Sequence, residues 1–215
     1  MQKYPDGLKS NDYKELYSRW FQFSAFTPVF RAHGTNVPRE VWQFGEKGTS
    51  YYDNQVKYIH LRYRLLPYIY SMSHQVTANN YTLLRGLAMD FTTDTRTFDI
   101  DNAYMFGTSL LVRPVFHPQS EEKNISVYLP EHNGEYWYDF WTGKAFEGGR
   151  EQMQANTLDI LPLYVKAGSI LPLAEVKQYA MEYPDRELEL RIYGGADAAF
   201  LWYEDEGDSY RYEDG

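Results

Sequence analysis

The sequence predicts an α+β chain, with helices over about the first eighty residues and an antiparallel β-sandwich after them. Apolar residues recur at helical spacing in two stretches before residue 80. Beyond that point the pattern changes to short β-type runs separated by Gly, Pro, Asn and Asp. A single predicted strand lies between the two helices, and one strand cannot bury its faces alone. The first part is therefore expected to be the end of a larger α/β barrel.

The first helix is expected from about Tyr13, after a loop over residues 1–12. Asn11 or Asp12 is suited to cap it, because a short polar side chain can accept from a free amide of the first turn. The residues expected to form its apolar stripe, up to its end, are Leu16, Trp20, Phe23 and Phe26.

A short strand is expected over residues 27–33, and it places Arg31 and His33 at alternate positions near its carboxyl end. Alternate residues of an extended segment lie on the same face, so both side chains should point the same way. Two readings stay open at this point. A cation and an imidazole suit a hydroxyl-rich or anionic ligand, and two solvated polar residues are also a common end for a strand.

Residues 34–50 are expected to form a long polar loop, and a loop of that length inside a compact fold is usually functional or disordered. The strongest helical pattern follows over residues 51–79. Pro67 should kink or divide this helix, because it lacks an amide donor and clashes with the preceding turn. Asn79 and Asn80 are suited to end it.

Seven β-type runs follow, which indicates an antiparallel sandwich or a barrel-like sheet. The tetrapeptides WTGK and FEGG have the composition of hairpin turns. Residues 178–187 are the most polar break in this half and could mark a subdomain boundary. The seven runs are LLRGLAMDF, AYMFGTSLLVRPVF, NISVYLP, YWYDFWTG, TLDILPLYVKAGSILPL, ELELRIYG and AAFLWYEDEG.

Composition narrows the classes of partner. The net charge is −9 without basic runs, which argues against nucleic acid and anionic membranes. Aromatic residues make up 18% of the chain, and such rings line carbohydrate clefts or fill sandwich cores. Cysteine is absent, which excludes disulfides and thiolate chemistry. Residues 1–20 are too polar for a signal segment, and an exported or periplasmic location stays open.

Several segments in one order resemble glycoside hydrolase family 31, which includes α-glucosidases, α-xylosidases and related transglycosylases. The resemblance implies the end of a catalytic (β/α)8 barrel over residues 1–80 and a proximal β-sandwich over residues 81–177. It implies the truncated start of a distal β-domain over residues 178–215. The segments that carry the resemblance are RWFQFSAFTPVFRAHG, HLRYRLLPYIYSM, YMFGTSLLVRPVF, EYWYDFWTGKAFEGG, LPLYVKAGSILPL and FLWYEDEGDSYRYEDG.

This resemblance implies that the chain is the C-terminal part of a retaining exo-α-glycosidase that hydrolyses terminal α-linked sugars. Retaining glycosidases need two carboxyl groups, a nucleophile and an acid/base. The family carries its nucleophile in a WxDMNE-type motif on the fourth barrel strand and its acid/base on the sixth. No WxDMNE-type motif occurs in the 215 residues, and the sixth-strand Asp is not found either. No catalytic residue is therefore assigned, and the chain by itself is expected to be inactive.

The family's R-x-H pair matches Arg31 and His33. The resemblance implies that His33 bonds sugar hydroxyls, and a neutral imidazole offers the donor and the acceptor that a vicinal diol requires. Arg31 is expected mainly to brace the site. Trp42 and Phe44 follow the predicted strand and favour an ordered loop. They either wall the cleft against the C–H faces of a sugar or pack the loop onto the barrel.

No metal site or cofactor is expected, since the histidines and the acidic C-terminal run lack ligand spacing. The expected partner is an oligosaccharide with a terminal α-linked sugar, bound by the intact enzyme. The alternative function is a non-catalytic carbohydrate-binding or structural β-sandwich module. Self-association through the exposed barrel remnant is a further expectation, because residues 1–80 alone would leave barrel-facing apolar surface open.

Overall fold

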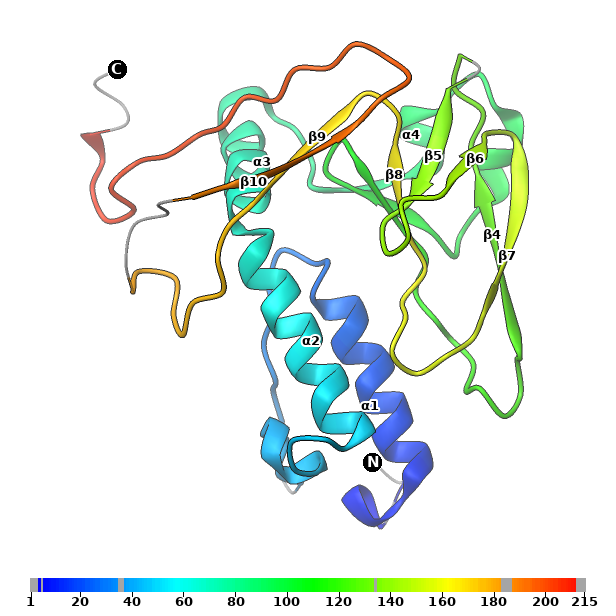
Figure 1. The fold of residues 1–215 in the computed structure, drawn as a ribbon, viewed down its shortest axis with the longest axis vertical. Helices are drawn as coiled ribbons and strands as arrows, with labels where there is room; N and C mark the ends of the chain where they lie inside the picture. Colours follow the sequence, from blue (N-terminus) through cyan, green and yellow to red (C-terminus); the bar gives the residue numbers. More distant parts are fainter. Residues whose placement is uncertain (1–3, 5, 35–36, 134, 183–186, 212–215) are drawn as a thin grey trace.

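Helices form the first part of the chain and antiparallel sheets the rest, as the sequence predicts (Figure 1). The structure is a computed structural model, and it describes residues 4, 6–34, 37–133, 135–182 and 187–211. None of the helices in these ranges has the length and apolar character needed to cross a membrane.

The first α-helix, α1 (Asn11–Ser24), follows a single 3-10 turn, η1 (Gly7–Lys9). Its cap is Ser10, whose hydroxyl accepts from the Tyr13 amide at 3.4 Å. The helix therefore starts ahead of the two predicted caps, because a hydroxyl at residue 10 already satisfies one free amide of the first turn. It ends two residues before Phe26.

The predicted apolar stripe of α1 is only partly buried. Leu16 is 37% exposed and Trp20 is 60% exposed, whereas Phe26, just beyond the helix, is fully buried. The face turned to the β part instead carries polar side chains, Ser18, Arg19 and Gln22, all of them buried. The prediction was wrong for Leu16 and Trp20, because the surface that α1 meets offers backbone carbonyl groups to which polar side chains donate.

The strand predicted over residues 27–33 does not form. A bend covers residues 27–28, and the backbone from residue 29 to residue 34 is irregular and unpaired within the described ranges. Val29 is 68% exposed. A strand needs a neighbour to satisfy its amides and carbonyls, and none of the described strands lies next to this segment. The loop that follows contains a short 3-10 helix, η2 (Val41–Phe44).

The long helix divides as predicted. It forms α2 (Ser50–Arg64) and α3 (Leu66–Asn79), separated at Leu65. Pro67 lies in the first turn of α3, where its missing amide would have no intrahelical partner in any case. Asn80 ends α3 in the left-handed conformation, with φ 54°. This agrees with the tolerance of Asn for such caps.

The described residues of the β part form one six-stranded antiparallel sheet and two strand pairs. β4 pairs with β7, and β9 pairs with β10. Short helices α4 (Leu87–Asp90) and η3 (Thr95–Asp99) follow β1. The large sheet has the order β1 (Leu84–Gly86), β2 (Tyr104–Phe106), β3 (Leu110–Val112), β8 (Leu163–Lys166), β5 (Tyr136–Asp139) and β6 (Ala145–Glu147). The pairs are β4 (Asn124–Leu129) with β7 (Arg150–Ala155), and β9 (Ser169–Leu173) with β10 (Glu189–Tyr193).

One of the two predicted hairpins is confirmed. WTGK joins the paired strands β5 and β6, and Gly143 in it has φ 72°. FEGG instead leads from β6 in the large sheet to β7 in another sheet, so it is a crossing between sheets. The run over residues 198–207 forms no strand, because the described segment lies along α3 and pairs with none of the described strands.

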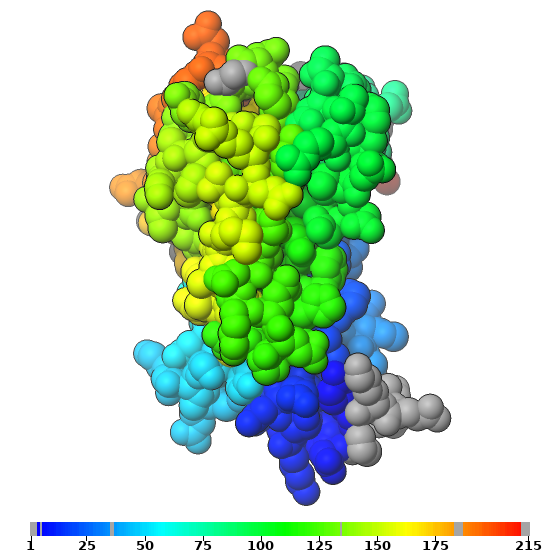
Figure 2. Space-filling model, turned by 90° about the vertical axis from the view of Figure 1, so that its right-hand side faces the viewer, coloured from blue at the N-terminus to red at the C-terminus, as the bar shows by residue number. Residues whose placement is uncertain are grey.

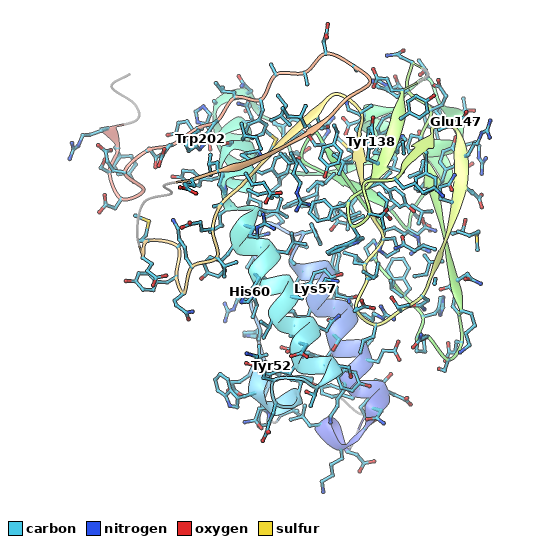
Figure 3. All side chains as sticks on the ribbon, viewed as in Figure 1. Tyr52, Lys57, His60, Tyr138, Glu147 and Trp202 are labelled. Atoms are coloured by element: carbon cyan, nitrogen blue, oxygen red, sulfur yellow. The ribbon has the colours of Figure 1, made fainter. Side chains whose placement is uncertain are left out.

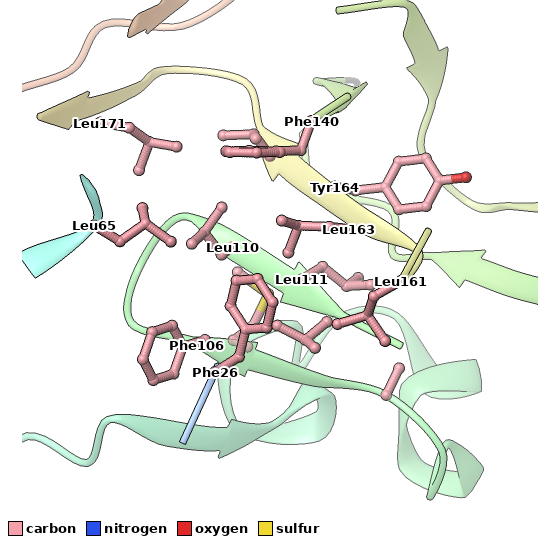
Figure 4. Packing of buried hydrophobic residues seen from close by; sticks show 14 of the residues in the cluster. Phe26, Leu65, Phe106, Leu110, Leu111, Phe140, Leu161, Leu163, Tyr164 and Leu171 are labelled. Atoms are coloured by element: carbon pink, nitrogen blue, oxygen red, sulfur yellow. The ribbon is translucent and has the colours of Figure 1, made fainter. Parts of the chain in front are cut away.

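The helical part and the β part share a hydrophobic cluster. Phe26 and Leu65 are fully buried in it together with Leu110 and Leu163 from the large sheet (Figure 4). Figure 2 shows the two parts in contact, with the dark-blue surface of α1 directly beneath the green surface of the β part. The division at residues 80 and 178 stays a prediction, and Tyr193 of β10 also belongs to this cluster.

Candidate functional site

Arg31 and His33 lie in the irregular segment after α1, and both are exposed. Phe30 anchors this segment, because its ring packs edge-on against Phe21 of α1 with the centroids 4.8 Å apart. The anchor at Phe30 thus holds the segment at α1, and the two polar side chains that follow reach solvent.

His33 borders an open cavity of about 510 Å³. The described residues that line it form two short stretches, Ala32–Gly34 and Val37–Glu40. Arg31 does not line it. The site therefore offers an imidazole, a guanidinium from Arg39 and a carboxylate from Glu40 around one hollow. Such a mixture of donors and acceptors can bond the hydroxyl groups of a sugar.

Gly34 allows the two stretches to approach each other. Its φ is 143°, and a Cβ at this position would lie 2.6 Å from Nη1 of Arg39. Arg39 is held in turn: its Nη1 donates to the Val37 carbonyl at 3.0 Å, and its own carbonyl accepts from the Tyr17 hydroxyl at 3.2 Å. A residue with a side chain at position 34 would be strained and would push Arg39 away.

Trp42 and Phe44 have different environments. Trp42 is 69% exposed, and it is not among the residues that line the cavity. Phe44 is only 2% exposed and stacks on Tyr17, with ring centroids 4.5 Å apart and an angle of 21° between the planes. Its ring has no free face for a sugar in this structure, so Phe44 packs the loop rather than walling a cleft.

The sequence reasoning missed Arg39 and Glu40. Their only signal is position, since they follow Pro38 a few residues after Gly34, where a loop can fold back on itself. Among the described residues no three His, Cys, Asp or Glu side chains gather as a metal site would require.

A larger cavity of about 1150 Å³ lies between α1 and the stretch from residue 100 to residue 121. Trp20 and Phe116, each 60% exposed, line it together with the carboxylates of Asp101 and Glu121. The self-association expected through the exposed barrel remnant of residues 1–80 stays a prediction.

Comparison with known sequences gives the family. Residues 7–72 match the TIM-barrel domain of glycosyl hydrolases family 31, and residues 80–171 match the family 31 C-terminal domain. The chain is 46% identical over 204 residues to the α-xylosidase of Saccharolobus solfataricus, across 94% of this chain and 27% of that protein. It is 34% identical to α-glucosidase 2 of Bacillus thermoamyloliquefaciens, across 97% of this chain and 26% of that protein.

Solved structures indicate the same family. The family 31 α-xylosidase of Xanthomonas citri superimposes on the whole chain with a TM-score of 0.90 and 40% identity, over 23% of that structure. A family 31 dextranase of Flavobacterium johnsoniae, solved with isomaltotriose, gives a TM-score of 0.85 at 34% identity. The match covers 94% of this chain and 24% of the dextranase chain. The chain spans about a quarter of the length of these relatives. The two matched domains and these similarities show that the chain belongs to glycoside hydrolase family 31.

Proposed function

We propose that this chain supplies the end of the catalytic barrel and the C-terminal β-domain of a retaining exo-α-glycosidase of α-xylosidase or α-glucosidase type. Its substrate would be an oligosaccharide with a terminal α-linked sugar. The 46% identity to an α-xylosidase is the observation that supports this most strongly. The boundaries that we propose are 1–80 for the barrel end, 81–177 for the proximal sandwich and 178–215 for the start of a distal domain.

In this proposal His33 contacts the sugar that is cleaved off. The imidazole is exposed beside the cavity of about 510 Å³, and it can donate and accept at once, as two neighbouring hydroxyls require. The carboxylate of Glu40 and the guanidinium of Arg39 lie on the same cavity and would accept from and donate to further hydroxyls. Arg31 would brace the site from outside the hollow.

Trp42 would provide an apolar wall near the same site. Its exposed indole ring can stack on the C–H face of a sugar, as aromatic rings commonly do in carbohydrate clefts. Phe44 is not included, because Tyr17 covers its ring.

The reacting carboxyl groups would come from sequence outside the 215 residues, so the test must supply them. In the Saccharolobus solfataricus α-xylosidase, the matching stretch of 204 residues would be replaced by that of this chain. The rate of hydrolysis of an aryl α-xyloside would be compared among three proteins: the unaltered chimera and its His33→Ala and His60→Ala variants. His60 is an exposed histidine on α2, away from the cavity lining (Figure 3), so it controls for the loss of an imidazole.

The chimera should be active, and His33→Ala should lower kcat/KM about 100-fold, because two hydrogen bonds of about 1.4 kcal/mol each are lost. His60→Ala should leave kcat/KM unchanged. An active chimera that tolerates His33→Ala would refute the role given to His33. A folded but inactive chimera would refute the proposed function of the chain.

A further inference from the structure

The backbone carbonyl groups of residues 25–28 all accept hydrogen bonds from side chains of other elements. Arg62 on α2 donates from Nη1 to the carbonyl of Ala25 at 2.9 Å and to that of Thr27 at 2.6 Å. Its Nη2 donates to the carbonyl of Pro28 at 3.1 Å. The last carbonyls of a helix and those just beyond it have no intrahelical partner, so this arginine satisfies three of them at once.

The remaining carbonyl, that of Phe26, accepts from the Tyr104 hydroxyl at 2.8 Å. Tyr104 belongs to β2, so this donor comes from the β part of the chain. Its ring also packs edge-on against Phe23 of α1, with centroids 6.0 Å apart. Arg62 and Tyr104 thus bond four consecutive carbonyls, and we refer to this arrangement over residues 25–28 as the carbonyl clamp.

Both donors are committed to the clamp. In the part of the chain that the structure describes, Arg62 forms no ion pair with a carboxylate, and its guanidinium donates to the three carbonyl groups of the clamp. Burial lowers the pKa of Arg62 to about 10 and raises the pKa of Tyr104. Both groups therefore keep their protons at neutral pH and remain donors.

The clamp lies at the start of the segment that leads to His33. Beyond Pro28, the Val29 carbonyl accepts from the Thr27 hydroxyl at 2.7 Å, and the Phe30 ring packs against Phe21. The backbone from residue 29 to residue 34 is irregular and pairs with none of the described strands, so the position of His33 depends on where the preceding residues are held. Whatever fixes the backbone at residues 25–28 therefore also fixes the point from which this segment runs toward the cavity.

We propose that Arg62 and Tyr104 are positioning residues for His33, and that the clamp fixes the path of residues 29–33. In this proposal the β-domain takes part in building the sugar site through Tyr104. The proposal rests on the proposed function only in so far as His33 contacts sugar. The backbone order of this segment can be measured on the 215-residue chain without any sugar.

The experiment measures backbone order parameters of residues 29–33 by NMR relaxation, together with the NOE between the rings of Phe21 and Phe30. The variants are Arg62→Met, which removes the donors, Arg62→Lys, which keeps one charged donor, and Tyr104→Phe. Arg64→Met is the matched control. It lies on the same helix and pairs with Glu189, far from the clamp.

We expect order parameters of about 0.85 in the unaltered chain, and values below about 0.6 with loss of the NOE in Arg62→Met. Arg62→Lys and Tyr104→Phe should lie between these limits, and Arg64→Met should match the unaltered chain. If the two residues had a purely structural role, the variants would lower the melting temperature. The order parameters and the NOE, measured well below that temperature, would then stay unchanged. That result would overturn the proposal.

If Arg62→Met does not fold, Arg62→Lys and Tyr104→Phe decide the question by the same readouts. Unchanged order parameters and an intact NOE in both would also overturn it. Because no sugar is present, this outcome is independent of the chimera assay. The clamp can hold while His33 proves dispensable, and the reverse can also be found.

Discussion

The Arg19 guanidinium on α1 donates to the side-chain oxygen of Asn156 at 2.6 Å, and this bond ties the helical part to the β part. The same group donates to the Thr157 carbonyl at 2.8 Å and pairs with Glu15 at 3.2 Å. Arg19 is 5% exposed, so water replaces none of these partners easily. The polar face of α1 therefore forms part of the interface between the helical part and the β part.

Arg19→Met should lower the free energy of unfolding by about 3 kcal/mol, since it leaves buried acceptors without their charged donor. Urea unfolding followed by circular dichroism would measure this. The control is Arg150→Met, whose side chain is 68% exposed and pairs with Glu147 at 2.6 Å on the surface. That change should cost less than about 1 kcal/mol, and equal losses in the two variants would contradict the account.

Gly34→Ala should destabilise the loop beside the cavity by about 1 kcal/mol, because φ at this position is 143° and the new Cβ would crowd Arg39. Gly86→Ala is the matched control, since a Cβ there meets nothing within 4 Å. Urea unfolding compares the two. In the chimera, Gly34→Ala should also raise KM. A neutral Gly34→Ala would show that this contact does not hold the loop.

Stability should fall at alkaline pH. Burial raises the pKa of Tyr164 to about 12, and it raises those of Tyr58 and Tyr68 as well. In the unfolded chain a tyrosine ionises near pH 10, so above that pH the unfolded state loses protons that the folded state retains. The stabilising contribution is complete below about pH 10 and is lost as the pH rises toward and past about 12.

Melting temperatures measured from about pH 8 to about pH 12 would test this. Tyr164→Phe should make the decline less steep, because one of the groups that drives it is gone. A melting temperature that stays level up to about pH 12 would contradict the burial of these phenol groups.

The chain by itself should not hydrolyse an aryl α-xyloside or α-glucoside, because the WxDMNE-type motif is absent from its sequence. Release of the aryl group by the purified chain would be followed by absorbance. The active chimera serves as the positive control. Turnover that persists through purification would mean that carboxylates within these residues perform the chemistry.

Local signals in the sequence predicted local features well. Pro67 and Asn80 marked the division and the end of the long helix, because their effects depend on their own backbone alone. The family resemblance predicted the order of the two parts.

Features that depend on distant partners were not predictable. The buried polar face of α1 requires Asn156 and Thr157, which lie more than 130 residues along the chain. The strand expected over residues 27–33 lacks a neighbour among the described residues, and no local pattern reveals that. Arg62 and Tyr104 carry no motif that indicates their shared role at residues 25–28.

The most direct test of the central claim is a crystal structure of the active chimera with xylose bound. The account predicts a nitrogen of the His33 imidazole within about 3.2 Å of a sugar hydroxyl, and a cavity lined by residues 32–34 and 37–40 around that sugar. A sugar bound at the catalytic centre with no contact to His33 would contradict it.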